Sequence, residues 1–367
     1  MKYSAPGKLF ISGEWSILEV GNRGLVAAVN NRVHVSINES EHFSASAQEF
    51  GVKDVRFDFK EGKTHFHSDE KTRGTLKLLG EAIGTSLNFL SGHGIHNKPF
   101  HISTSSKDTQ FEVNGLMKKV GFGSSAAVVV ATVAGVLDFH GYKATKEEIY
   151  KLATIAHFYA QGKVGSAFDV AASTYGGVFV YSRFDPNWLT KKIESGESLG
   201  IIVKEKWPSL VVEEIVVPDD FNLLVGWTGE SASTTNAVKQ MNEYKSVHKE
   251  KYYNLMNSIA KIASHAIDSF KKNEREKFLE LLRKNEELLR ELGNETGVNI
   301  ETPELRKLSD IANDYDGAGK LSGAGGGDCG IAVCFDEITA NNIISAWSDE
   351  GLIPLEVTID RDGVRKD

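Results

Sequence analysis

The spacing of apolar residues predicts both strands and helices in the first half of the chain. Residues 8–12 and 25–37 carry alternating or β-branched apolar residues between turn signals, which is typical of strands. Residues 74–89 instead place apolar side chains at helical spacing, at Leu76, Leu79 and Ile83. By the same criteria we expect further helices over 124–139, 146–159 (with Thr145 as its cap) and 166–174, and further strands over 100–103, 177–181, 210–217 and 222–227.

Beyond about residue 234 the pattern changes to long amphipathic helices. These are expected over residues 251–270, 274–292 and 303–313, followed by a strand at 329–335, a helix at 337–350 and a last strand at 355–359. The order predicts an α+β protein with two lobes. Polar, loop-like sequence collects before the helical part, so we expect domains over residues 1–190 and 191–367.

Composition and charge narrow the class of protein. The 367 residues are 41% hydrophobic and 25% charged, as in ordinary globular proteins, and the formal net charge of −8 argues against a nucleic-acid surface. Apolar runs stay well short of the roughly 20 residues that span a bilayer, so no membrane association is expected. Cys329 and Cys334 fall on one predicted strand, where a disulfide between them is not expected. Reduced thiols and a cytoplasmic location fit best.

A small-residue string, Gly121–Ala127 (GFGSSAA), stands before the apolar helix expected at 124–139. Such a loop brings backbone N–H groups and two hydroxyls to the positive end of a helix dipole, which favours a bound phosphate. The GxxxxGK[ST] pattern of the common P-loop does not occur in the chain. The alternative is a helix start with a serine cap and no ligand.

Three other strings carry candidate chemistry. Ser322–Gly330 (SGAGGGDCG) leaves the backbone bare, so that a bound group can approach closely. Gln161–Asp169 (QGKVGSAFD) flanks a glycine turn with Lys163 and Asp169, and an aspartate there could hold Mg²⁺, orient or deprotonate an acceptor, or merely cap the helix. Lys8 lies on a predicted strand between glycines, where a point charge suits a phosphoryl group.

Two polar residues within apolar helical patterns are open to simpler explanations. We interpret His157 as a structural histidine, because its neighbours in the predicted helix are apolar. Asn285 falls on the apolar face of the helix expected at 274–292, so it is either a hydrogen-bonded core residue or a residue that points into a site.

Taken together, the strings resemble the three motifs of the GHMP kinase superfamily in both order and spacing. They are an N-terminal PGKxxxxGE segment, a central GxGSSAA loop and a C-terminal SGAGGGDC loop. The resemblance implies an N-terminal α/β nucleotide-binding lobe, a C-terminal ferredoxin-like α/β lobe, and an active site in the cleft between them. Within the superfamily, residues 156–171 and 224–228 are similar to the phosphomevalonate kinase family.

That resemblance implies transfer of the γ-phosphoryl group of ATP, with Mg²⁺, to the phosphate of (R)-5-phosphomevalonate. Lys8 would meet the transferred phosphoryl, and Asp169 would orient the acceptor or help hold Mg²⁺. The nucleotide phosphates would be bound by Lys119, Gly121, Gly123, Ser124, Ser125 and Ala126, with Ser125 as a second Mg²⁺ ligand. The acceptor would contact Lys8, Trp15, Lys163, Ser166, Asp169, Ser322, Gly323, Ala324 and Gly325. Partners would be these small molecules, and the protein a monomer or homodimer.

Two positions depart from the family pattern. Ala167 stands where the family often has glycine, and we expect the added methyl group to be tolerated because the residue is predicted to be helical. Trp15 stands where the family commonly has tyrosine, so an indole N–H replaces a phenol hydroxyl. Mevalonate kinase is the alternative, although its HGxPSGxD string is not matched at residues 162–169. Kinases for other small alcohols, and an ATP-binding sensor on the same fold without catalysis, are the remaining alternatives.

Overall fold

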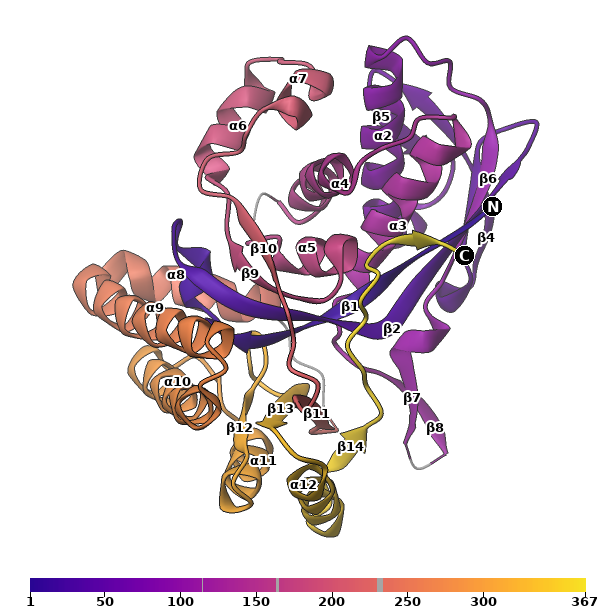
Figure 1. Cartoon of the computed structure of the whole chain (residues 1–367). Helices are drawn as coiled ribbons and strands as arrows, with labels where there is room; N and C mark the ends of the chain where they lie inside the picture. Colours follow the sequence, from indigo (N-terminus) through magenta and orange to yellow (C-terminus); the bar gives the residue numbers. More distant parts are fainter. Residues whose placement is uncertain (114, 163–164, 230–233) are drawn as a thin grey trace.

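A nine-stranded sheet and a four-stranded sheet organise the two lobes (Figure 1). The computed structural model describes residues 1–113, 115–162, 165–229 and 234–367. In the first sheet the order is β10-β9-β2-β6-β3-β4-β5, and β1 pairs with β2 and β15. Its strands are β1 (Lys2–Ser12), β2 (Arg23–Glu39), β3 (Ser44–Ala47), β4 (Val52–Lys60), β5 (Lys63–Phe66), β6 (Phe100–Ser105), β9 (Val178–Ser182), β10 (Val211–Ile215) and β15 (Arg365–Lys366).

Helices cover one face of this sheet (Figure 1). They are α1 (Glu70–Thr75), α2 (Lys77–Gly92), α3 (Ser124–Phe139), α4 (Lys146–Ala160) and α5 (Phe168–Tyr175), with α6 (Pro186–Glu194) and α7 (Leu199–Lys204) beside them. The helix α3 is apolar nearly all round and packs between the sheet and the neighbouring helices. The expected cap at Thr145 is confirmed, because its side chain and Glu148 form a capping box at the start of α4.

The second lobe is built on a smaller sheet of order β12-β13-β11-β14. Its strands are β11 (Asn222–Trp227), β12 (Ala318–Leu321), β13 (Cys329–Cys334) and β14 (Ile353–Leu355), and its helices are α8 (Thr234–Val247), α9 (Lys249–Lys271), α10 (Arg275–Thr296), α11 (Pro303–Asp314) and α12 (Glu337–Asp349). A separate hairpin, β7 (Gln110–Val113) and β8 (Leu116–Lys119), leads into the phosphate loop. No helix in the described ranges has the length and apolar character needed to cross a membrane.

Strands β1 and β2 serve two hydrophobic cores at once. Phe10 and Val26 point into the core beneath the helices of the first lobe. Leu9, Ile11 and Leu25 point the other way, into a second core that they share with β11, β13, α9 and α10. Side chains alternate along a strand, so a strand buried on both faces reads as a continuous apolar run. This shared core fixes the second lobe against the first.

The segment that follows residue 190 still packs in the first lobe. Helix α7 packs on α2 and α4, and Trp207 is buried in the first lobe's core. Strand β10 pairs with β9 in the first sheet. We therefore propose that the boundary follows β10, between Ile215 and Asn222, because the segment before it buries its apolar side chains in the first lobe.

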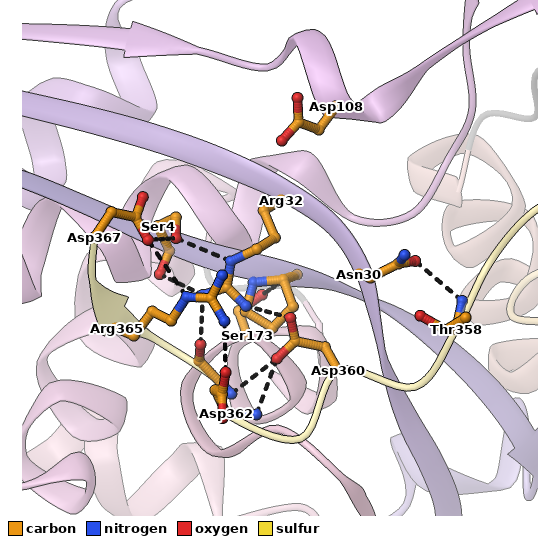
Figure 2. A network of polar contacts seen from close by, with 12 residues as sticks. Ser4, Asn30, Arg32, Asp108, Ser173, Thr358, Asp360, Asp362, Arg365 and Asp367 are labelled. Atoms are coloured by element: carbon orange, nitrogen blue, oxygen red, sulfur yellow. Dashed lines mark hydrogen bonds and ion pairs between the residues drawn. The ribbon is translucent and has the colours of Figure 1, made fainter.

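The last residues of the chain return to the first lobe along β1 and β2 (Figures 1 and 2). Arg32 of β2 is buried at the centre of this contact and forms an ion pair with Asp360. Its guanidinium also donates to the Ser4 hydroxyl at 2.9 Å and the Gly363 carbonyl at 2.6 Å. The expected strand at 355–359 is wrong beyond Leu355, because this segment makes only an isolated bridge at Ile359.

Candidate active site

A cavity of about 460 Å³ lies where the two lobes meet, and most of the sequence-predicted site residues line it. The first lobe contributes Lys8 of β1, Lys119 of β8, and residues from the starts of α3 and α5. The second lobe contributes Val238, Gly323, Ala324 and Asp328. The predicted residues brought together here are Lys8, Trp15, Lys119, Gly121, Gly123, Ser124, Ser125, Ser166, Asp169, Gly323 and Ala324.

The phosphate loop opens α3 towards this cavity. Gly123 is the N-cap residue of α3, in the left-handed region at φ 81°, which glycine adopts without strain. No side chain caps the helix, so the first-turn N–H groups lack the oxygen that a serine cap would supply. Ser124 and Ser125 follow directly and line the cavity. The helix start therefore presents backbone donors, two hydroxyls and a positive dipole end to a ligand.

Helix α5 starts at the same cavity, so two helix dipoles converge there. Asp169 lies in the first turn of α5, and one of its carboxylate oxygens accepts from the backbone N–H of Val170 at 2.9 Å. Its other oxygen lies 4.0 Å from Nε2 of His157. From β1, Lys8 donates to the Gly121 carbonyl at 3.0 Å. Lys8, Lys119 and two positive helix ends thus face the same space as Asp169, an arrangement that suits a polyanion.

Ala167 corrects one sequence expectation. It was expected to lie in the helix, where a methyl group is tolerated, but it is the N-cap residue of α5 at φ 62°. For a residue with a Cβ, this left-handed conformation costs roughly 1–2 kcal/mol. The family's glycine at this position thus matches a backbone requirement that this chain meets with strain.

Three of the predicted site residues are placed differently. Ala126 is fully buried inside α3 and does not line the cavity. Ser322 does not line the cavity, because its hydroxyl is hydrogen-bonded to β1. The hydroxyl accepts from the Phe10 N–H at 2.9 Å and donates to the Phe10 carbonyl at 3.0 Å. Gly325 packs against Ile300, whose carbonyl would lie 2.0 Å from an added Cβ. Lys163 lies outside the described residues.

Residues that were not predicted to bind a ligand also line the cavity. His157, interpreted as a purely structural histidine, faces it from the end of α4 together with Gln161, whose side-chain nitrogen is 3.0 Å from Nε2 of His157. Glu14 and Asp328 enter from the first and third motifs. Spacing alone could not place His157, because the helix that carries it is apolar on either side. Glu14 and Asp328 lay within recognised strings but had no assigned role.

Of the two roles considered for Asn285, a core residue or a residue that points into the site, the structure shows a hydrogen-bonded core residue. It is fully buried in α10, and its side-chain oxygen accepts from the Ser12 hydroxyl at 2.9 Å and from the Gly13 N–H at 3.4 Å. These contacts fix the end of β1, just before Glu14 and Trp15. Asn285 therefore supports the site from behind and does not line it.

A buried charge cluster joins the lobes beneath the cavity. Lys320 of β12 is fully buried and forms an ion pair with Glu14. Glu286 of α10 is buried beside them, where it accepts from the Ser309 hydroxyl at 3.2 Å and from the Leu321 N–H at 3.1 Å. Burial raises the pKa of Glu286 to about 8, and the nearby Lys320 only partly opposes this. When Glu286 is protonated it carries no charge, and the opposite charges of Lys320 and Glu14 then balance each other.

This cluster predicts a pH dependence of stability. An ordinary Glu loses its proton near pH 4.5, but folded Glu286 keeps it up to about pH 8, so unfolding releases a proton in this window. The stability contributed by this group is present below about pH 4.5 and declines as the pH rises towards 8. Glu286→Gln, which keeps an acceptor for Leu321, should therefore lose less stability than the wild type between about pH 5 and 8. Urea unfolding of both proteins at about pH 5 and 8 measures the change in the free energy of unfolding. If the two proteins lost the same amount of stability, the predicted role of Glu286 would be wrong.

The described residues contain no group of three or more His, Cys, Asp or Glu side chains that could hold a metal ion. Side-chain oxygens that can act as magnesium ligands do line the cavity, at Ser124, Ser125 and Asp169. Magnesium is commonly bound by one or two protein oxygens together with substrate phosphates and waters. The donors present therefore fit a magnesium ion that arrives with a nucleotide.

Family models match both lobes of the chain. The model "GHMP kinases N terminal domain" matches residues 74–177, which include the phosphate loop and the start of α5. The model "GHMP kinases C terminal" matches residues 266–352, which include the third glycine-rich string. The chain belongs to the GHMP kinases. It is a phosphotransferase of two-lobed α+β fold, and the expectation of an enzyme on this fold is confirmed.

Individual relatives resemble the chain over nearly its whole length. Phosphomevalonate kinase from Streptomyces sp. (strain CL190) is 30% identical and covers 98% of this chain and 97% of its own. Mevalonate kinase from Thermococcus sibiricus is 27% identical over 99% of this chain and 97% of its own length. The solved phosphomevalonate kinase of Streptococcus pneumoniae, in complex with phosphomevalonate and AMPPNP, superposes with a TM-score of 0.82 at 26% identity, covering 98% and 99%. The chain is therefore similar to kinases of the mevalonate pathway.

Proposed function

We propose that the protein transfers the γ-phosphoryl group of ATP to (R)-5-phosphomevalonate, giving the diphosphate. The observation that carries this proposal is the convergence of Lys8, Lys119 and the N-termini of α3 and α5 on one cavity. A phosphate acceptor is mostly dianionic at pH 7, so its attacking oxygen is already deprotonated. The chemical problem is then to bring two polyanions together, which calls for cations and backbone donors more than for a strong base.

The nucleotide half of the cavity follows from the phosphate loop. Lys119 and the N–H groups of Gly123, Ser124 and Ser125 would hold the nucleotide phosphates, with Gly121 beside them in the loop, while buried Ala126 supports the loop by packing. Magnesium, held by Ser125 and Asp169, would offset the charge of the phosphates. Lys8 would meet the transferred phosphoryl group, because its ammonium lies beside the phosphate loop.

The acceptor half of the cavity lies towards Trp15 and α5. The indole N–H of Trp15 is buried and makes no hydrogen bond to the described residues, although Trp15 lines the cavity. An oxygen of the acceptor would supply the partner that this N–H lacks. Ser166, Gly323 and Ala324 would bound the acceptor, and Asp169 would orient it. Lys163, outside the described residues, would offset the acceptor phosphate. Ser322 would act indirectly, through its bonds to Phe10.

An acceptor panel tests this proposal. ADP release should be measured with ATP, Mg²⁺ and mevalonate, phosphomevalonate or diphosphomevalonate in separate reactions. Phosphomevalonate is expected to give a kcat/KM higher than that of mevalonate by about tenfold or more, because mevalonate has no phosphate and so cannot form charge-assisted hydrogen bonds worth about 1.5–3 kcal/mol each. A higher kcat/KM with mevalonate would overturn the proposal in favour of mevalonate kinase, which the 27% identical Thermococcus sibiricus relative keeps as the second candidate.

A further inference from the structure

Asp328 crosses the cleft from the second lobe to the phosphate loop. Its backbone is anchored on the second sheet, since its carbonyl accepts from the Thr228 N–H at 2.9 Å and from the Thr228 hydroxyl at 3.1 Å. Its side chain reaches into the first lobe, where it accepts from the N–H of Gly121 at 2.9 Å. One residue thus joins the third glycine-rich string directly to the first residue of the phosphate loop.

The same contact explains why residue 121 is glycine. A Cβ added at Gly121 would lie 1.6 Å from Oδ2 of Asp328. Gly121 is not among the glycines with positive φ, so its backbone conformation would accept alanine. The glycine is therefore required by the close approach of Asp328 and not by the turn itself.

The Gly121 peptide also connects Asp328 to Lys8. The carbonyl of Gly121 accepts from the Lys8 ammonium at 3.0 Å, while its N–H donates to Asp328 at 2.9 Å. Asp328 adopts φ 65°, a left-handed conformation that aspartate and asparagine tolerate better than most residues. Burial raises the pKa of the Asp328 carboxyl, which the Gly121 N–H and Lys8 partly oppose. A carboxylate that faces a site for polyanions opposes the binding of the polyanion, so a compensating role is expected of its hydrogen bond to the loop.

We propose that Asp328 is a positioning residue for phosphoryl transfer, which acts through the Gly121 peptide to fix the phosphate loop and the Lys8 ammonium against the second lobe. The proposal rests on the proposed function only in taking Lys8 as the cation that meets the transferred group. Asp328 itself contributes negative charge near the nucleotide phosphates. It therefore favours the geometry of transfer while weakening nucleotide binding.

A double-mutant cycle between Gly121 and Asp328 tests the proposal. Gly121→Ala is expected to lower kcat by about tenfold or more, because the added methyl group displaces the Asp328 carboxylate and breaks its hydrogen bond to the Gly121 N–H. Asp328→Gly, which accepts φ 65° without strain, should lower kcat about tenfold. In the double variant the clash is gone, so kcat should stay within about threefold of Asp328→Gly alone. Gly74→Ala is the matched control, because an added Cβ there meets nothing within 4 Å.

Asp328→Asn separates the hydrogen bond from the charge. Asparagine keeps an acceptor for the Gly121 N–H and tolerates the left-handed backbone, so kcat is expected to stay within about threefold of the wild type. Because the variant removes a negative charge near the phosphates, it should bind Mg²⁺–AMPPNP more tightly, by about threefold or more, in a calorimetric titration without acceptor. A merely structural role would not produce this combination.

AMPPNP binding and kcat test the role of Asp328 independently of which acceptor the enzyme prefers. AMPPNP binding requires no acceptor, and kcat can be measured with whichever acceptor of the panel is phosphorylated fastest. Circular dichroism confirms that each variant is folded, and if Gly121→Ala does not fold, the comparison of Asp328→Gly with Asp328→Asn still decides. Fully additive losses in the cycle, or an Asp328→Asn variant as slow as Asp328→Gly, would overturn the positioning role.

Discussion

Lys8→Met is expected to lower kcat by at least about 10²-fold, because it removes the ammonium beside the phosphate loop while nearly keeping the length of the side chain. The loss should appear mainly in kcat, since the charge on the transferred group is stabilised most in the transition state. Steady-state ADP release with the best acceptor of the panel measures both parameters.

Lys77→Met is the matched control, because Lys77 is exposed at the start of α2 and does not line the cavity. It should leave kcat unchanged. Asp169→Asn, which also removes one charge with little change of shape, is expected to lower kcat to a similar extent. If Lys8→Met or Asp169→Asn kept kcat within about threefold of the wild type, the role assigned to that residue would be wrong.

Arg32→Met is expected to destabilise the fold by about 3–5 kcal/mol, because it leaves the buried carboxylate of Asp360 without its cation. The substitution also removes the donors to the Ser4 hydroxyl and the Gly363 carbonyl. The returning C-terminal segment should then detach from β1 and from the end of α5, where Val364 donates to the Thr174 carbonyl at 3.2 Å. Urea unfolding followed by fluorescence and by circular dichroism gives the change in the free energy of unfolding when the two probes agree.

Arg365→Met provides the control within the same segment (Figure 2). Arg365 makes ion pairs with Asp362 and Asp367, but its side chain is 47% exposed, and such surface pairs contribute about 0–1 kcal/mol. A double variant, Arg32→Met with Asp360→Asn, should recover part of the loss by removing the unpaired charge. Equal effects of Arg32→Met and Arg365→Met would show that the buried pair contributes no more than a surface one.

Local patterns predicted most of the regular elements. The helix over 124–139 and the strand over 222–227 were predicted with the observed bounds of α3 and β11, because both are apolar runs bounded by clear turn signals. The hairpin strands β4, β5, β7 and β8 were missed, since short, partly exposed strands carry a weak period-2 signal. Helices α6 and α7 were missed in the stretch treated as the join between the lobes.

The sequence by itself determined the family, the three motifs and about half of the described residues that line the cavity, because these depend on short strings of glycine, serine and charged residues whose chemistry is local. The tertiary structure alone decided which of those residues meet. It turned Ser322, Gly325 and Ala126 away from the cavity and brought Asp328 onto Gly121, residues 207 positions apart. Such contacts depend on how the two lobes pack through a shared core, and no local pattern in the chain records that packing.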